Sequence, residues 1–262
     1  MRFQYFSDIH LEFYNENIPK IQRTFIQKLD KQTDKPGFLL VAGDIGMPSR
    51  PSYSTFLQSL SPLYEKIFIT TGNHEYYKMP YYSLTEMDNY CRDICRTMPQ
   101  DNVVFLQNNT YKLNDSLSIF GGTFWTDIPP SKHHSVMHSV NDYKLIPNMT
   151  PSLSSLLHEK SVSLLNYHIK EDTHMKWIVM SHHMPSFDLI DPKYRATTNT
   201  DMNYAFASNV SVANDPRVLA WVYGHTHSQN QQGKFYCNPI GYPGENKNST
   251  LFKEFSIHLY ES

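Results

Sequence analysis

The chain has 262 residues, of which 40% are hydrophobic and 18% charged, and its formal net charge is -2. This length and composition predict a packed globular protein, and we expect one domain over residues 1–262. The near balance of charge argues against a nucleic-acid partner and against attraction to an acidic membrane, so any anionic ligand must be held by local charge.

The N-terminal segment MRFQYFSDIHLEF carries Asp8, His10 and Glu12, which the apolar core of a signal peptide would not contain. No run approaches the roughly 18 apolar residues that a membrane span needs. The 3 cysteines cannot all pair with one another, so reduced thiols are the simplest interpretation. Together these features predict a cytoplasmic protein with no membrane partner.

Short apolar runs alternate with longer amphipathic stretches along the chain. The predicted strands are 2–7, 37–44, 66–72, 103–107, 117–122, 177–182, 219–225, 234–239 and 254–260, and the predicted helices are 19–31, 52–62, 80–97 and 152–170. Alternation of strand and helix in the first half predicts a largely parallel sheet covered on both faces, and the denser strands of the second half predict a second sheet. The stretches 126–151 and 184–216 are expected to be long irregular loops, which are usually functional.

Potential metal ligands follow five of the predicted strands. They are Asp8 and His10, then Asp44, then Asn73 and His74, then His182, and finally His225 and His227. A single polar residue after a strand is usually a turn or cap residue, but the repetition at five strand ends points to one shared site, because ligands bind at the carboxyl ends of strands in open α/β sheets. Glycine precedes Asp44, Asn73 and His225, and its small size lets backbones approach closely in a crowded site.

The chemistry of this set favours hard or borderline divalent cations. Carboxylate, amide and imidazole ligands suit Mn, Fe, Zn or Ni, and they do not suit metals that prefer thiolates. With His74 set aside, the other seven residues exceed the needs of one tetrahedral ion but fit two ions that share a bridging carboxylate. Two divalent cations against two carboxylates leave an excess of positive charge, which favours a small phosphate-ester substrate.

Five sequence blocks, taken in order, resemble the signature of the calcineurin-like metallophosphoesterases. The blocks are Asp8-x-His10, Gly43-Asp44, Gly72-Asn73-His74-Glu75, His182, and Gly224-His225-Thr226-His227. The resemblance implies an α/β fold, a four-layer sandwich in which two mixed sheets stack face to face between outer helices.

The resemblance also implies roles for these residues. Asp8, His10 and His227 would bind the first metal, Asn73, His182 and His225 the second, and Asp44 would bridge the two. His74 would protonate the leaving alkoxide or stabilise charge on the phosphoryl oxygens. The implied reaction is hydrolysis of a phosphate monoester or diester by direct attack of a metal-bridging hydroxide.

Further segments resemble a small, single-domain subset of that family. They make Trp125, Asp127, Asn141, Asp142, Arg195 and Asn203 candidates to line the substrate pocket, together with His183. Arg195 is the most interesting of these, because a guanidinium in a loop after a ligand strand can grip phosphate oxygens bidentately. Ordinary packing of surface loops is the alternative interpretation.

One departure from the superfamily pattern is informative. Protein phosphatases of the superfamily carry Asp-Arg-Gly soon after the second block, whereas Asp44 is followed here by Ile-Gly-Met-Pro. A protein phosphatase is therefore less favoured, and the sequence identifies no partner that orients His74. The alternative function is an inactive scaffold of the same fold, but such scaffolds typically lack a ligand or the histidine that corresponds to His74.

Overall fold

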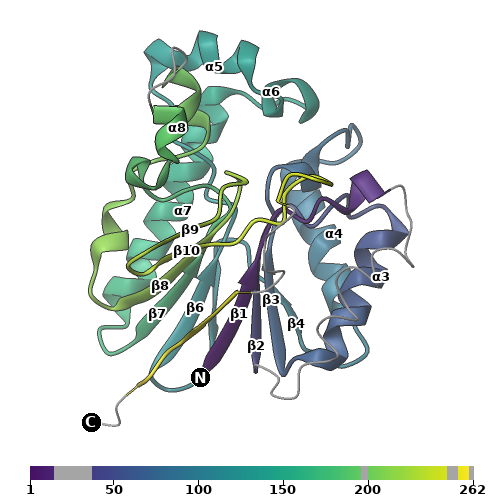
Figure 1. The fold of residues 1–262 in the computed structure, drawn as a ribbon, viewed down its shortest axis with the longest axis vertical. Helices are drawn as coiled ribbons and strands as arrows, with labels where there is room; N and C mark the ends of the chain where they lie inside the picture. The colour runs from purple at the N-terminus through teal and green to yellow at the C-terminus, as the bar shows by residue number, and fades with distance from the viewer. Residues whose placement is uncertain (15–36, 196–199, 247–252, 260–262) are drawn as a thin grey trace.

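Two mixed sheets form the centre of the molecule (Figure 1). The computed structural model describes residues 1–14, 37–195, 200–246 and 253–259, so the predicted helix over 19–31 lies outside the described residues. The five-stranded sheet has the order β11 (Lys253–Ser256), β1 (Arg2–Phe6), β2 (Phe38–Ala42), β3 (Lys66–Thr70) and β4 (Val103–Phe105). The six-stranded sheet has the order β5 (Asn109–Lys112), β6 (Leu117–Gly121), β7 (Lys176–Met180), β8 (Val218–Tyr223), β10 (Phe235–Cys237) and β9 (Asn230–Gln232).

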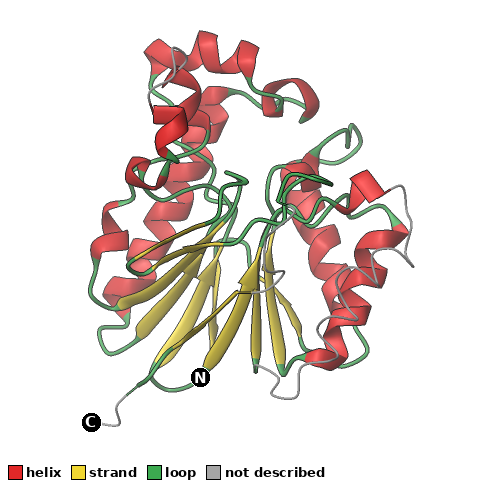
Figure 2. Ribbon diagram, in the orientation of Figure 1, coloured by secondary structure: helices red, strands yellow, loops and turns green. Residues whose placement is uncertain are grey.

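Both sheets are parallel in the middle and antiparallel at an edge. β1, β2, β3 and β4 run parallel, and β11 pairs antiparallel with β1. In the other sheet β6, β7, β8 and β10 run parallel, whereas β5 and β9 are antiparallel edge strands. The parallel arrangement brings the carboxyl ends of the central strands to the same end of the molecule (Figure 2).

The side chains alternate between two cores, which explains the layers. In β2, Leu40 and Ala42 belong to the core between the sheets, together with Ile119 and Ile178 of the other sheet. Val41 instead faces the helices α3 (Pro51–Leu60) and α4 (Leu84–Arg96). The helix α7 (Pro151–Glu171) covers the outer face of the six-stranded sheet. The expected four-layer sandwich of the α/β class is therefore confirmed.

The helix boundaries follow from local chemistry. Ser83 and Glu86 form a capping box at the start of α4, because each side chain bonds the backbone N–H of the other. Thr150 accepts a bond from the N–H of Leu153, and Pro151 occupies the first turn of α7, where no N–H is needed. The predicted helices over 52–62, 80–97 and 152–170 are thus confirmed with small shifts at their ends.

The two stretches expected to be irregular contain short helices, so that expectation was wrong. The first holds η5 (Pro130–Lys132), α5 (His133–Ser139) and α6 (Asp142–Leu145), and the second holds η6 (Phe187–Leu189), α8 (Pro192–Arg195), η7 (Thr200–Ala205) and η8 (Ser211–Asn214). Helices of one or two turns carry too little periodic pattern to be seen in sequence. α5, α6 and α8 lie at the end of the molecule where the central strands terminate (Figure 1).

The cysteines and the helices bear on what the composition predicted. The three cysteines are free and buried. No helix in the described part of the chain combines the length and the apolar character that a membrane crossing requires. The expectation of one domain over residues 1–262 stays a prediction.

Candidate metal centre

The strand ends bring the predicted ligands into two adjacent groups. Asp8, His10 and His227 form one group, and Asp44, His182 and His225 form the other, with the donor atoms of each group within 4.8 Å of one another. Both groups lie where the carboxyl ends of strands meet, as the sequence predicted.

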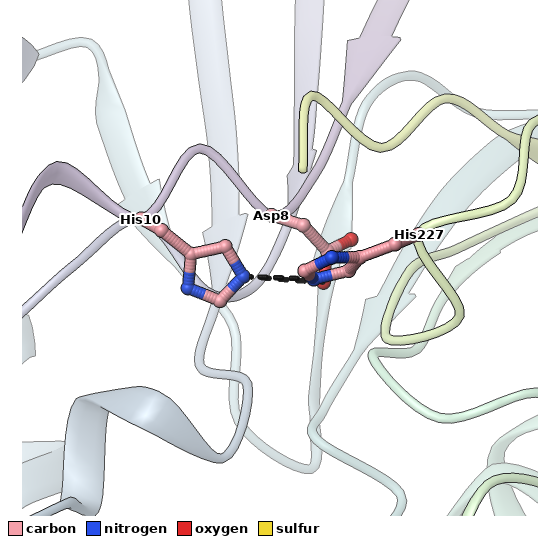
Figure 3. Close-up of side chains that lie close together, drawn as sticks. All are labelled: Asp8, His10 and His227. Carbon is pink, nitrogen blue, oxygen red and sulfur yellow. Dashed lines mark hydrogen bonds and ion pairs between the residues drawn. The ribbon is translucent and has the colours of Figure 1, made fainter. Parts of the chain in front are cut away.

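The first group joins the loop after β1 to the loop after β8 (Figure 3). Nε2 of His10 lies 2.9 Å from Nε2 of His227, and Oδ1 of Asp8 lies 3.5 Å from the latter atom. Asp8 and His10 are completely buried. Burial lowers the pKa of His227, but its hydrogen bonds and charge interactions with Asp8 and Glu245 together outweigh this effect and raise the value to about 9.

The second group is centred on Asp44. Oδ2 of Asp44 lies 3.3 Å from Nε2 of His182 and 3.7 Å from Nε2 of His10, so this carboxylate lies between the two groups. The amide oxygen of Asn73 is 3.0 Å from the same nitrogen of His182. Burial lowers the pKa of His182, but the charge of Asp44 raises it to about 10.

The residues present fit a pair of divalent cations. Nε2 of His225 is buried and has no hydrogen-bond partner, although buried polar atoms are normally satisfied. Imidazole nitrogens of His10 and His227 point at each other beside a carboxylate, an arrangement that a cation between them would stabilise. The carboxylates, the amide oxygen and the imidazoles match the ligand preferences of Mn, Fe, Zn and Ni.

Glycines allow the loops to approach this closely. A Cβ atom on Gly72 would lie 2.1 Å from Oδ1 of Asp44, and one on Gly224 would lie 2.7 Å from Oδ2 of Asp8. No residue with a side chain fits at such separations. The close approach predicted for the glycines that precede Asn73 and His225 is therefore confirmed.

The backbone of the ligands themselves is strained. Asp8, His10, Asp44, His225 and His227 all have positive φ, between 49° and 68°. Asp and His tolerate this left-handed region better than most residues, but each instance still costs about 1–3 kcal/mol. Such strain concentrates at functional sites, where the surrounding structure imposes it.

His74 has a carboxylate partner that the sequence did not reveal. Glu12, on η1 (Leu11–Tyr14), accepts a hydrogen bond from Nδ1 of His74 at 2.9 Å and lies 3.3 Å from Nδ1 of His10. Burial raises the pKa of Glu12, but its hydrogen bonds to both imidazoles lower it to about 2, so it is ionised at neutral pH. The signal was the third polar residue in the segment Asp8-x-His10-x-Glu12.

Glu75 organises the loop around Asp44. Its side chain, which is fully buried, accepts hydrogen bonds from the N–H groups of Gly72 at 2.7 Å, Ile45 at 2.8 Å and Asp44 at 3.2 Å. Burial and the nearby charge of Asp44 raise the pKa of Glu75 to about 8. Glu75 therefore ties the loop after β2 to the loop after β3.

Asp142 fixes the orientation of Asn73. Oδ1 of Asp142 accepts hydrogen bonds from Nδ2 of Asn73 at 2.7 Å and from the hydroxyl of Tyr77 at 2.5 Å. Because the amide nitrogen is engaged there, the amide oxygen of Asn73 faces His182. Asp142 is thus a positioning residue rather than one that only lines the pocket.

A cleft of about 300 Å³ opens over the two groups. Its walls include His74, Tyr77, Asn141, Asp142, Tyr242 and Glu245. The ring of Tyr242 lies 4.6 Å from those of His10 and His227, and Glu245 lies 2.7 Å from Nδ1 of His227. Neither Tyr242 nor Glu245 was predicted from the sequence to belong to the site.

The candidate substrate contacts are only partly brought together. Asn203 lines a cavity beside the cleft, whereas Asp127 borders a separate hollow next to α7. His183 is buried, with Nδ1 3.2 Å from the carbonyl oxygen of Thr123. The ring of Trp125, also buried, lies 5.3 Å from that of His183.

The guanidinium of Arg195 binds backbone carbonyls rather than facing the cleft. Its Nε donates to the carbonyl oxygen of Ile190 at 2.7 Å, and its Nη2 donates to that of Asp188. It is not among the residues that line the cleft. Phosphate binding by Arg195 stays a prediction that this geometry does not support.

Comparisons with known proteins show the family and the fold of the chain. A model of the calcineurin-like phosphoesterase family matches residues 1–229. An uncharacterized protein of Acanthamoeba polyphaga mimivirus is 31% identical over 278 residues, which cover 97% of this chain and 96% of that protein. The crystal structure of a phosphopantetheinyl hydrolase from Mycobacterium tuberculosis has a TM-score of 0.69 at 16% identity, over 97% of this chain and 95% of that one, a likeness that shows the fold alone. Because the family model matches most of its length, the chain belongs to the calcineurin-like phosphoesterases.

Proposed function

We propose that the protein hydrolyses small phosphate esters and depends on two divalent cations. The observation that carries this proposal is the position of Asp44, whose carboxylate lies within 3.7 Å of imidazole nitrogens from both ligand groups. One carboxylate between two sets of ligands suits a dinuclear site better than two independent ions.

The ligand assignments follow from the two groups. Asp8, His10 and His227 would hold one cation, and Asn73, His182 and His225 the other, with Asp44 shared. When bound, the cations would supply positive charge for the phosphoryl oxygens and lower the pKa of a water molecule between them. Mn, Fe, Zn and Ni are all compatible with these ligands.

His74 is proposed as the catalytic imidazole. Its Nδ1 donates to Glu12, so Nε2, which lies 3.5 Å from the hydroxyl of Tyr242, is the atom available in the cleft. Without bound cations, burial lowers the pKa of His74, but Asp44 and Glu12 together outweigh it and raise the value. A protonated Nε2 is suited to give its proton to the leaving oxygen.

The proposal is tested with metal-free protein reloaded separately with Mn²⁺, Fe²⁺, Zn²⁺ and Ni²⁺. Each form is assayed against phosphomonoesters, phosphodiesters and cyclic nucleotides, while metal content is measured by mass spectrometry. We expect two equivalents of metal and turnover of at least one ester class. Two bound equivalents without any turnover would favour the scaffold alternative. A cytoplasmic location stays a prediction that this experiment does not address.

A further inference from the structure

A second cavity continues from the cleft. It has a volume of about 410 Å³, and Tyr194, Met202, Phe206 and Thr226 line both spaces. Beyond them it is bounded by Met184, Ile190 and Asn203, so the part of the lining that described residues provide carries no charged side chain. A charged or strongly polar group placed there would lose its water without gaining ionic partners, whereas an apolar group would be stabilised by burial.

The cavity lies on the side of the cleft away from His74. The ring of Phe206 is 4.6 Å from that of His225, which belongs to the second ligand group. The ring of His74 is instead 4.4 Å from that of His10, which belongs to the first. The proton donor and the apolar cavity therefore face a bound phosphate from different sides.

In-line displacement at phosphorus distinguishes the substituents by position. The attacking and leaving oxygens are roughly collinear with phosphorus, and the other three oxygens lie in the plane between them. If His74 serves the leaving oxygen, a group that enters the cavity must be attached to one of the in-plane oxygens. A monoester has no such group, whereas a phosphodiester has one that remains on phosphorus after hydrolysis.

We propose that the second cavity binds an apolar substituent that is retained on the phosphorus of a phosphodiester substrate, an inference that rests on the proposed hydrolase function. A volume of about 410 Å³ falls within the range of roughly 300–1,000 Å³ typical of small-molecule sites. Burial of each methylene group strengthens transition-state binding, and one methylene commonly changes kcat/KM about tenfold in a well-fitted pocket.

The test uses alkyl 4-nitrophenyl phosphates in which the alkyl group is methyl, butyl or octyl. The leaving group is the same throughout, so differences in the release of 4-nitrophenolate by the Mn²⁺-loaded enzyme report on the retained group alone. We expect kcat/KM to rise at least about tenfold from methyl to octyl. We also expect 4-nitrophenyl phosphate, the monoester, to react more slowly than the octyl diester.

Two methionine variants locate the effect. Met202→Gln introduces an amide of similar length into the cavity, and we expect it to reduce the octyl-to-methyl ratio at least about threefold. Met137→Gln is the matched control, since Met137 is 43% exposed on α5 and lines neither space, and it is expected to preserve the ratio. Thermal unfolding shows whether both variants are folded. If Met202→Gln is unfolded, the dependence of wild-type kcat/KM on alkyl length decides whether the cavity binds the retained group.

The outcomes separate the two proposals. Turnover of the methyl diester with no dependence on chain length would overturn the role of the cavity and leave the hydrolase function standing. A monoester that reacts faster than every diester would do the same. If protein carrying two equivalents of Mn²⁺, Fe²⁺, Zn²⁺ or Ni²⁺ hydrolysed none of these esters in any of the four forms, both proposals would fail.

Discussion

The two sides of the cleft hold their imidazoles in different ways. On the side of His74, carboxylates bind the Nδ1 atoms, with Glu12 2.9 Å from His74 and Glu245 2.7 Å from His227. On the other side the partner of Nδ1 is a backbone carbonyl, since the oxygen of Ala42 lies 2.8 Å from Nδ1 of His182. A carboxylate orients an imidazole and favours its positive charge, whereas a carbonyl orients it without adding charge. One side therefore keeps carboxylates beside its imidazoles, whereas on the other the ring of Phe206, which lines the second cavity, lies 4.6 Å from that of His225.

Asp44 lies between these two sides, and removal of its charge should impair metal binding on both of them. Asp44→Asn keeps an oxygen that can accept from the N–H of His74, now 2.8 Å from Oδ1, but removes the shared charge. We expect the bound metal to fall from two equivalents to less than about one, with essentially all turnover lost. Asp115→Asn is the control, since that side chain is 99% exposed. An Asp44→Asn protein that still held two equivalents would refute the bridging role.

His74→Ala should lower the rate of catalysis and leave metal binding intact. Because His74 is proposed as the catalytic imidazole and not as a metal ligand, we expect both metals to stay bound while kcat falls about 10²–10⁴-fold. Metal analysis and steady-state kinetics on the same preparation separate these effects. His134→Ala, on the exposed face of α5, controls for loss of an imidazole. Undiminished turnover in His74→Ala would contradict the assigned role.

Glu12→Gln and Glu245→Gln compare the catalytic importance of a buried carboxylate with that of an exposed one. The side chain of Glu12 is 7% exposed and serves both His10 and His74, whereas that of Glu245 is 45% exposed. Water and salt screen the exposed charge far more strongly. We expect kcat to fall about 10–100-fold in Glu12→Gln and less than about threefold in Glu245→Gln. Equal losses in the two variants would show that burial does not distinguish them.

Asp142→Ala examines the other side. Without this carboxylate the amide nitrogen of Asn73 keeps only the hydroxyl of Tyr77, 3.0 Å away, and the amide is free to turn. We expect one of the two metals to bind about tenfold more weakly and the other to be unchanged, as measured by metal titration. Asp127→Ala is the control because Asp127 borders a separate hollow. Two unchanged affinities would argue against this positioning role.

The clustering of the predicted ligand side chains could be expected because each lies within four residues of the end of a strand with a clear apolar pattern. In a parallel sheet the ends of such strands must meet, so Asp8 and His227 are neighbours although far apart in sequence. Glu12 was not predictable as the partner of His74, since it lies on a single turn of helix 62 residues away. Arg195 was predicted to bind phosphate, but its guanidinium donates hydrogen bonds to backbone carbonyls just before its own short helix. Contacts of that kind depend on loop geometry that sequence patterns do not encode.

The smallest effect on catalysis is expected at Asp88, whose network joins the two sheets rather than either side of the cleft. Gln107 donates to Thr71 after β3 at 3.1 Å, to Thr123 after β6 at 3.0 Å and to Asp88 on α4 at 3.2 Å. The hydroxyl of Tyr76 also donates to Oδ1 of Asp88, at 2.5 Å. Burial raises the pKa of Asp88 to about 6, so the ionised carboxylate destabilises the fold at neutral pH.

Asp88→Asn should therefore stabilise the protein with a defined dependence on pH. The folded pKa of about 6 exceeds the unfolded value of 3.8, so the folded state binds the extra proton between these values, and wild-type stability falls as pH rises through that window. An asparagine oxygen can accept both existing hydrogen bonds without charge. We expect the variant to be more stable at pH 8 by up to about 3 kcal/mol, a gap that closes toward pH 4, with turnover unchanged within about twofold. Urea unfolding across this range measures the gap. Asp93→Asn, on the same helix with a side chain 69% exposed, should show no such slope, and parallel curves for wild type and Asp88→Asn would contradict the raised pKa.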